Sequence, residues 1–247
     1  LLLSSGSHGK YLGRIDLKVN NGKVVETSSN LIPIFSDVIP PDKEISNLIN
    51  KVRLPFEKEC NRVIGETETL LYRRGNFNGS WDDVICDTII QERDTEISLS
   101  PGFRWGTSIL PGQKITIDDI YSQTAMNYPE VYRTEMTGKM IKKLLEDVCD
   151  NIFNPDPFFQ QGGDMVRVGG LTYTCSPKNE IGKRISNLRM VSKNKPLEAS
   201  KKYIVGGWGS INPNVEGPPV YRLLENYISN KKVLTKNNLN AVNVKGM

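Results

Sequence analysis

Helical and strand-like periodicities alternate along this chain, and their mixed order constrains its fold more than any single motif does. Apolar residues recur at helical spacing in four stretches, near 45–52, 81–89, 140–152 and 220–228. Short runs typical of strands lie between these stretches. The runs are 96–99, 114–117, 131–136, 184–191 and 202–205. This order predicts a mixed α/β domain in which helices and sheets form layers.

Capping residues and prolines predict where several helices begin or end. Pro55 ends or kinks the first helix, since proline has no amide hydrogen to donate. Ser80 is predicted to cap the second helix, with Asp82 and Asp83 in its first turn, and Thr137 is predicted to cap the third. The Lys- and Asn-rich tail from Ser229 onward predicts a mobile end or a last edge strand.

The clearest local prediction is a β-hairpin near the start of the chain. Alternating apolar residues on both sides of Asn21-Gly22 are typical of two strands joined by a type I′ turn. Pro40-Pro41 marks a change of element. We therefore expect a hairpin segment over 1–35, a linker over 36–41 and a main domain over 42–247, with both ends of the sequence as truncation points.

Composition excludes several classes of function. The 32 Lys and Arg and 28 Asp and Glu residues give a net charge of +4 and are spread along the chain, so no nucleic-acid footprint is predicted. No apolar run approaches the roughly 20 residues of a membrane helix, so no membrane partner is expected.

Histidine and cysteine usage limits the chemistry further. His8 is the only histidine, which excludes a Ser-His-Asp triad and a dinuclear metal centre of the usual His/Asp type within these residues. Cys60, Cys86, Cys149 and Cys175 form no C-x-x-C pair, so zinc ribbons and thioredoxin-like sites have no support. We expect buried or indifferent thiols, and a disulfide stays open because spacing does not report the separation of the residues.

Three loops carry candidate binding residues. Arg73 lies in the loop 72–79 just before a predicted helix, where guanidinium and amide groups could bind an oxyanion; a solvated turn is the alternative. Arg104 and Trp105 follow the strand that ends at Leu99, where α/β sheets place ligands; an arginine satisfied by backbone carbonyls is the alternative.

The third loop, 158–170, leads from two phenylalanines into two glycine pairs. Gln160 and Gln161 could hydrogen-bond an extended peptide there, and glycines such as Gly163 let backbones approach closely. A β-bulge and hairpin within the fold is the alternative. A further segment, 206–210, could shape the same cleft.

Several ordered runs together resemble the SoxB thiosulfohydrolase family, a branch of the 5′-nucleotidase superfamily, over nearly the whole chain. These runs are Gly6–Gly13, Tyr72–Gly79, Ser100–Thr107, Tyr128–Arg133 and Gln160–Gly170. The resemblance implies that residues 1–35 are the last piece of a calcineurin-like metallophosphatase domain and that 42–247 are the C-terminal substrate domain. The family's metal-ligand motifs lie upstream, so no metal ligand is expected here, and the segment alone should be inactive.

The resemblance also implies a reaction, cofactors and partners. The enzyme would be periplasmic and would use two manganese ions, held by the missing N-terminal domain, to hydrolyse sulfate from a cysteine S-thiosulfonate on the SoxYZ carrier protein during thiosulfate oxidation. Arg104 matches the substrate arginine of nucleotidases and Arg73 matches another, with Trp105, Gln161 and Gly163 lining the cleft.

Two other functions stay open. A nucleotide phosphohydrolase would need an aromatic clamp, for example Phe158 with Trp208, because Pro129-Glu130 stands where nucleotidases have the Pro-Phe that stacks the base. A module that docks a carrier protein without chemistry is the other alternative.

Overall fold

The structure is a computed structural model that describes residues 3–6, 9–73, 75–103, 106–125, 127–210, 212, 214–235 and 242–246. The chain divides into two compact units, 1–58 and 59–247. The division falls later than the predicted linker at 36–41. The helix that follows the predicted linker has no buried residue.

The first unit contains the predicted hairpin and one helix. Strands β1 (Tyr11–Asn20) and β2 (Lys23–Pro33) pair antiparallel. Asn21 and Gly22 have φ angles of 48° and 73°, as a type I′ turn requires, so the hairpin prediction is confirmed. Helix α1 (Lys43–Arg53) has Leu54 as its C-cap, and Pro55 follows directly, so the helix ends before this proline as predicted.

The first unit exposes an unusual amount of apolar surface. Along one face of β1, Ile15 and Leu17 are 39% and 53% exposed. On α1, Ile45, Leu48, Ile49 and Val52 are also exposed. Contiguous apolar surface of this kind drives association in water.

We therefore predict that residues 1–247, expressed alone, self-associate through the first unit. Static light scattering should give a mass above the 27.7 kDa of one chain. Leu17→Lys should lower that mass because it places a charge on the apolar face. Ser28→Lys is the matched control, since Ser28 pairs with Asp16 and points to the opposite face. A monomer before any substitution contradicts the prediction.

The second unit is built on a four-stranded sheet in the order β6-β11-β4-β7. Strand β11 runs parallel to β4 and antiparallel to β6, and β4 runs antiparallel to β7. The strands are β4 (Ile97–Ser100), β6 (Tyr132–Thr137), β7 (Arg167–Gly169) and β11 (Lys202–Gly207). Two of the three loops singled out in the sequence join this sheet, one after β4 and one before β7.

The second unit contains two further sheets, one of four strands and one of three. One has the order β10-β9-β8-β13 and the other β12-β3-β5. Their strands are β3 (Val63–Thr67), β5 (Lys114–Thr116), β8 (Leu171–Cys175), β9 (Ile185–Met190), β10 (Lys195–Pro196), β12 (Val233–Leu234) and β13 (Val242–Val244). The fold is therefore mixed α/β with several sheets, as predicted.

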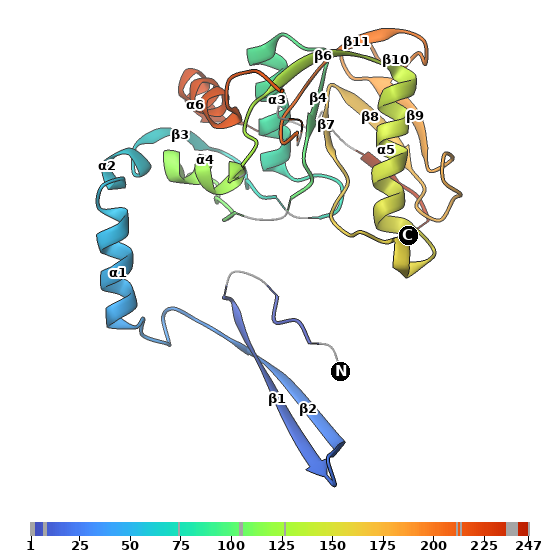
Figure 1. Ribbon diagram of the computed structural model, residues 1–247. Coiled ribbons are helices and arrows are strands. Elements are labelled where there is room, and N and C mark those ends of the chain that lie inside the picture. The colour runs from blue at the N-terminus through green and yellow to red at the C-terminus, as the bar shows by residue number, and fades with distance from the viewer. Residues whose placement is uncertain are drawn as a thin grey trace. The chain divides into compact units, whose positions relative to one another are not determined.

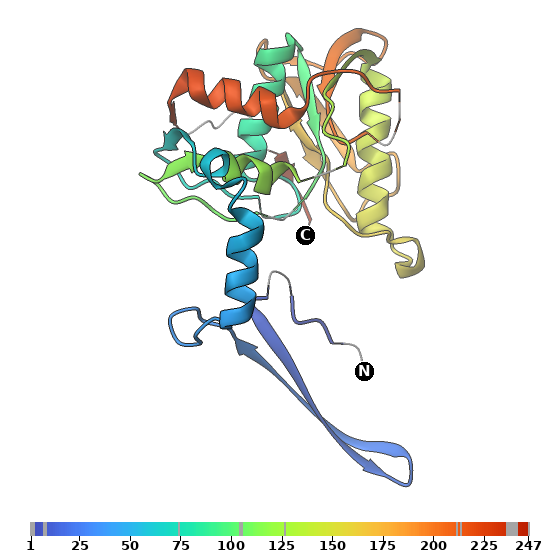
Figure 2. The same ribbon diagram turned by 60° about the vertical axis from the view of Figure 1, so that its left-hand side comes forward.

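Helices α3 (Ser80–Arg93) and α5 (Gly138–Phe153) lie on opposite sides of the main sheet (Figures 1 and 2). Ile97 and Leu99 of β4 join the core that contains α5, whereas Gly206 of β11 lies against Ile89 of α3. Helices α4 (Ile117–Thr124) and α6 (Val220–Lys231) complete the core on the α3 side. The short helices α2 (Glu57–Cys60) and η1 (Pro157–Phe159) lie outside both cores.

The helix ends confirm one predicted cap and correct another. Thr137 caps α5 by accepting a hydrogen bond from the amide of Met140, as predicted. Ser80 does not cap α3, whose N-cap is Gly79. The Ser80 hydroxyl instead accepts from the amide of Tyr72 and donates to the carbonyl of Leu70. The prediction was wrong because the preceding loop turns back onto the helix start.

Two further elements differ from the sequence prediction. The strand expected over 114–117 ends at Thr116, which caps α4 in a reciprocal pair with Asp119. The tail expected from Ser229 begins inside α6, and its edge-strand alternative is confirmed for Val242–Val244, which pairs with β8. Among the described residues, no helix is long and apolar enough to cross a membrane.

Candidate substrate-binding site

The candidate segments next to the main sheet lie at one end of its strands. Strands β4 and β11 are parallel and end at Ser100 and Gly207, and β7 begins at Arg167 opposite Ser100. Strand β6 begins at Tyr132 opposite Gly207. Residues 101–103 and 208–210, which follow β4 and β11, therefore lie at the same end of the sheet as residues 160–166, which lead into β7. This is where open α/β sheets place ligands.

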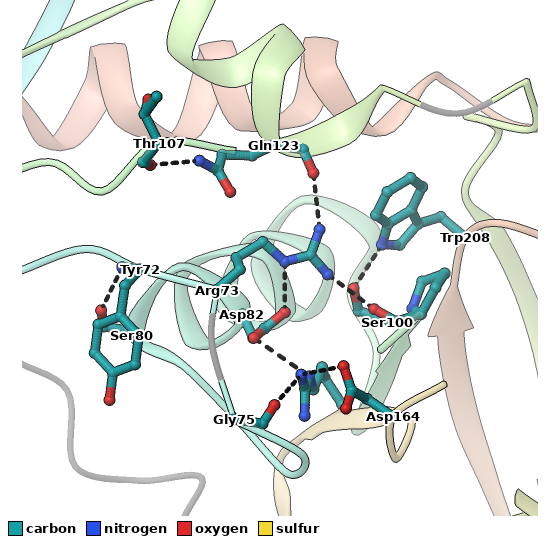
Figure 3. Close-up of polar contacts among 12 residues, drawn as sticks. Tyr72, Arg73, Gly75, Ser80, Asp82, Ser100, Thr107, Gln123, Asp164 and Trp208 are labelled. Carbon is teal, nitrogen blue, oxygen red and sulfur yellow. Dashed lines mark hydrogen bonds and ion pairs between the residues drawn. The ribbon is translucent and has the colours of Figure 1, made fainter. Parts of the chain in front are cut away.

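A buried carboxylate at the start of α3 contacts two arginines, one in the loop before this helix and one at the start of β7. Asp82 Oδ1 accepts a hydrogen bond from Arg73 Nε at 2.8 Å, and Asp82 Oδ2 lies 3.3 Å from Arg167 Nε (Figure 3). The three side chains are at most 1% exposed. Burial raises the pKa of Asp82, and the neighbouring guanidinium groups of Arg73 and Arg167 oppose that rise.

Arg73 connects this carboxylate to two backbone segments. Its Nη1 donates to the carbonyl of Gln123 and its Nη2 to the carbonyl of Pro101, each at 2.8 Å (Figure 3). Its Cζ lies 5.9 Å from the centre of the Phe103 ring. The sequence predicted that Arg73 meets an anion directly. In the structure its buried guanidinium instead holds the loop that leads to Arg104.

Arg167 connects the same carboxylate to the loop before α3. Its Nη2 donates to the carbonyl of Gly75 at 2.8 Å and lies 3.8 Å from a carboxylate oxygen of Asp164. Burial lowers the pKa of Arg167, against the attraction of the two carboxylates. Asp82, Arg73, Arg167 and Asp164 thus form one buried network of two positive and two negative side chains.

The loops also touch through their backbones. The amide of Met165 donates to the carbonyl of Asn76 at 2.9 Å. A Cβ on Gly102 would lie 2.3 Å from the carbonyl oxygen of Met165, so only glycine allows this approach. The three loops form a packed unit rather than three independent turns.

Gln123 anchors the segment after Arg104 and Trp105, which themselves lie outside the described residues. Its side-chain amide donates to the carbonyl of Thr107 at 2.9 Å. Gly106 has a φ of 83°, and a Cβ there would lie 2.3 Å from the Gln123 amide. Since Arg73 and Phe103 fix the segment on the other side, both flanks of the predicted anion-binding pair are held in place.

Gln161 and Gly163 lie in the exposed part of the loop 160–166. Gly162 and Gly163 have φ angles of 80° and 89°, which favour glycine, and the amide of Gly162 donates to the carbonyl of Asn151. This stretch leads directly into Asp164 of the buried network. The predicted peptide-binding residues are therefore connected to the buried network through the chain.

Trp208 lies at the same edge but is buried. Its Nε1 donates to the hydroxyl of Ser100 at 2.8 Å, and its side chain belongs to the core around α3 (Figure 3). Phe158 is 87% exposed and contacts Phe159 edge to face, with ring centres 5.4 Å apart. The suggested clamp of Phe158 with Trp208 is wrong, because Trp208 has no free face to offer a base.

Sequence reasoning missed the parts that organise the site. Asp82 was read only as a residue of the first helical turn, while Arg167 and Gln123 were given no role. An acidic residue beside buried Trp81 was an available signal, because buried carboxylates need partners. In the described part of the chain, no three His, Cys, Asp or Glu side chains cluster closely enough to hold a metal ion.

Asp82→Asn should destabilise the second unit by about 3–5 kcal/mol, because it leaves two buried guanidinium groups without their shared carboxylate. Urea unfolding followed by tryptophan fluorescence measures this loss. Asp83→Asn is the matched control: it removes the same charge one residue along the helix and should cost less than about 1 kcal/mol. Equal losses in the two variants would show that the network does not depend on Asp82.

Comparison with known proteins identifies a family and several similar proteins. Residues 63–213 match the family model described as "5'-nucleotidase, C-terminal domain". Among curated proteins, the trifunctional nucleotide phosphoesterase YfkN of Bacillus subtilis is 23% identical over 209 residues, covering 78% of this chain and 13% of that protein. Protein 5NUC of Lutzomyia longipalpis is 24% identical over 221 residues, covering 79% of this chain and 38% of that protein.

Two solved structures are similar over 97% of this chain. The sulfate thiohydrolase SoxB of Thermus thermophilus has a TM-score of 0.89 and 31% identity, with 45% of its length covered. A 5′-nucleotidase precursor from Thermus thermophilus has a TM-score of 0.80 and 18% identity, with 50% of its length covered, and this likeness shows the fold alone. The chain spans half or less of each of these relatives.

Proposed function

Since the chain belongs to the family of 5′-nucleotidase C-terminal domains, we propose that it is the substrate-facing part of a SoxB-type thiosulfohydrolase. This enzyme would release sulfate from a cysteine S-thiosulfonate on the SoxYZ carrier protein during thiosulfate oxidation. The observation that carries the proposal is the 31% identity to SoxB over nearly the whole chain, against 18% to the 5′-nucleotidase structure. Both SoxB and the 5′-nucleotidase precursor carry the names of hydrolases, which supports a hydrolase as the class of enzyme.

The proposed anion ligand is Arg104. A guanidinium group binds two oxygens of a sulfonate at once, and charge-assisted bonds of this kind are the stronger ones in proteins. Arg73 holds the preceding Pro101 carbonyl, and Gln123 holds the following segment through Thr107. We assign Arg73 a positioning role and Trp105 the role of excluding water.

The proposed contact for the carrier's flexible tail is the exposed stretch around Gln161 and Gly163. An extended peptide needs backbone groups and side-chain amides as partners, and positive-φ glycines leave room for its approach. Phe158 and Phe159 add an exposed apolar surface beside this stretch. These features support a peptide-borne substrate.

The proposed cofactors are two manganese ions, and the proposed location is the periplasm. The described residues do not fit such a centre, because they contain no cluster of three metal-binding side chains. The ligands would therefore belong to another part of the full-length protein. A bound metal there would lower the pKa of a water molecule and stabilise oxyanion charge.

The test uses the full-length protein loaded with manganese and a thiosulfonated SoxYZ carrier, and it measures sulfate release. Arg104→Ala should lower kcat/KM at least about tenfold, or 1.4 kcal/mol, because the sulfonate loses its clamp. Arg189→Ala is the matched control: Arg189 hydrogen-bonds Asn194 in the turn between β9 and β10, so its loss should leave the rate unchanged. Unchanged sulfate release in Arg104→Ala would remove Arg104 from the site.

A nucleotide phosphohydrolase is the second candidate, supported by the names of YfkN and the 5′-nucleotidase precursor. With Trp208 buried, Phe158 and Phe159 are exposed aromatic side chains that could stack on a base. AMP hydrolysis measured in parallel separates the two: AMP turnover without sulfate release replaces the sulfur assignment. Carrier binding without either reaction would indicate a docking module.

A further inference from the structure

Two cysteines from separate elements meet in the core of the second unit. Cys149 lies on α5 and Cys175 is the last residue of β8, 26 residues later. Their sulfur atoms are 3.6 Å apart, and both side chains are fully buried. A disulfide needs the sulfurs about 2.0 Å apart, so a small movement of the two side chains joins them.

The backbone on both sides of this pair is firmly held. Glu146, one turn before Cys149, accepts hydrogen bonds from the amides of Gly182, Arg184 and Ile185. Asp150, the residue after Cys149, pairs with Arg184 at 2.6 Å. Cys175 itself pairs with Ile185 in the sheet. The two sulfurs are therefore brought together by fixed elements rather than by a loop.

We propose that Cys149 and Cys175 form a disulfide when the protein folds in an oxidising compartment. The oxidant is a small-molecule or protein disulfide. One cysteine thiolate attacks it, forms a mixed disulfide and releases one thiol; the second thiolate then attacks the mixed disulfide and releases the other. The two protein thiols lose their protons and two electrons, and the oxidant becomes two thiols.

The bond would fasten both ends of the segment that carries part of the candidate site. Between the two cysteines lie Gln161, Gly163, Asp164 and Arg167. Closing this segment reduces the freedom of the unfolded chain, which stabilises the folded state. Fixing its ends also limits how far the buried network can move away from Asp82. The inference stands independently of which substrate the site binds.

The first experiment maps the thiols of the full-length protein after refolding in a glutathione redox buffer. Denatured samples are alkylated with and without prior reduction, and the peptides are identified by mass spectrometry. We expect a linked peptide pair containing Cys149 and Cys175, with Cys60 and Cys86 alkylated in both samples. Quantitative alkylation of Cys149 and Cys175 without reduction overturns the proposal.

The second experiment measures the consequence for stability. Reduction should lower the Tm of the refolded wild-type protein by about 5–10 °C. The same treatment should leave the Tm of Cys149→Ser and Cys175→Ser unchanged, and Cys60→Ser should respond like the wild type. A wild-type Tm insensitive to reduction also overturns the proposal. If a serine variant does not fold, the wild-type thiol map decides alone.

Discussion

The candidate site depends on one buried carboxylate that two guanidinium groups share. A charge removed from water is costly unless opposite charges and hydrogen bonds surround it. Asp82 meets that condition through Arg73 and Arg167, which lie far apart in the sequence, one before α3 and the other at the start of β7. The start of α3 adds to this, because the first turn of a helix favours negative charge. Folding of the second unit therefore assembles the loops.

The charge balance of this network limits what it can bind. The two positive charges of Arg73 and Arg167 are balanced by the two negative charges of Asp82 and Asp164, and all four residues are buried. An anionic substrate therefore needs a cation from outside the network. Arg104 follows the Pro101 carbonyl that Arg73 holds, which makes it the natural candidate. In the proposed arrangement the buried Arg73 would position the loop and Arg104 would supply the positive charge.

Local patterns predicted the parts of the fold that local physics decides. The Asn-Gly turn, the Thr137 cap and the apolar stripe of α6 each depend on neighbours within a few residues. The convergence of the loops was also predictable, because the segment after Leu99 follows a strand of an α/β sheet. The burial of Arg73 was not, since its partners lie nine, 28 and 50 residues away. Ser80 failed as a cap for the same reason: Leu70 and Tyr72 use its hydroxyl.

The proposed anion ligand, Arg104, does not by itself distinguish a sulfur substrate from a nucleotide. A sulfonate and a phosphate present similar tetrahedral oxygens, so an arginine binds either of them. A nucleobase also requires a flat aromatic face, whereas a peptide arm requires polar groups along an open path. Trp208 is committed to Ser100 and the core, and Glu130 is held in a bridge to Pro219 where a stacking residue would be expected. The exposed glycines beside Gln161 suit a peptide backbone better than a base. Under the proposed function, the surroundings of the anion rather than the anion site itself would select a protein-borne substrate.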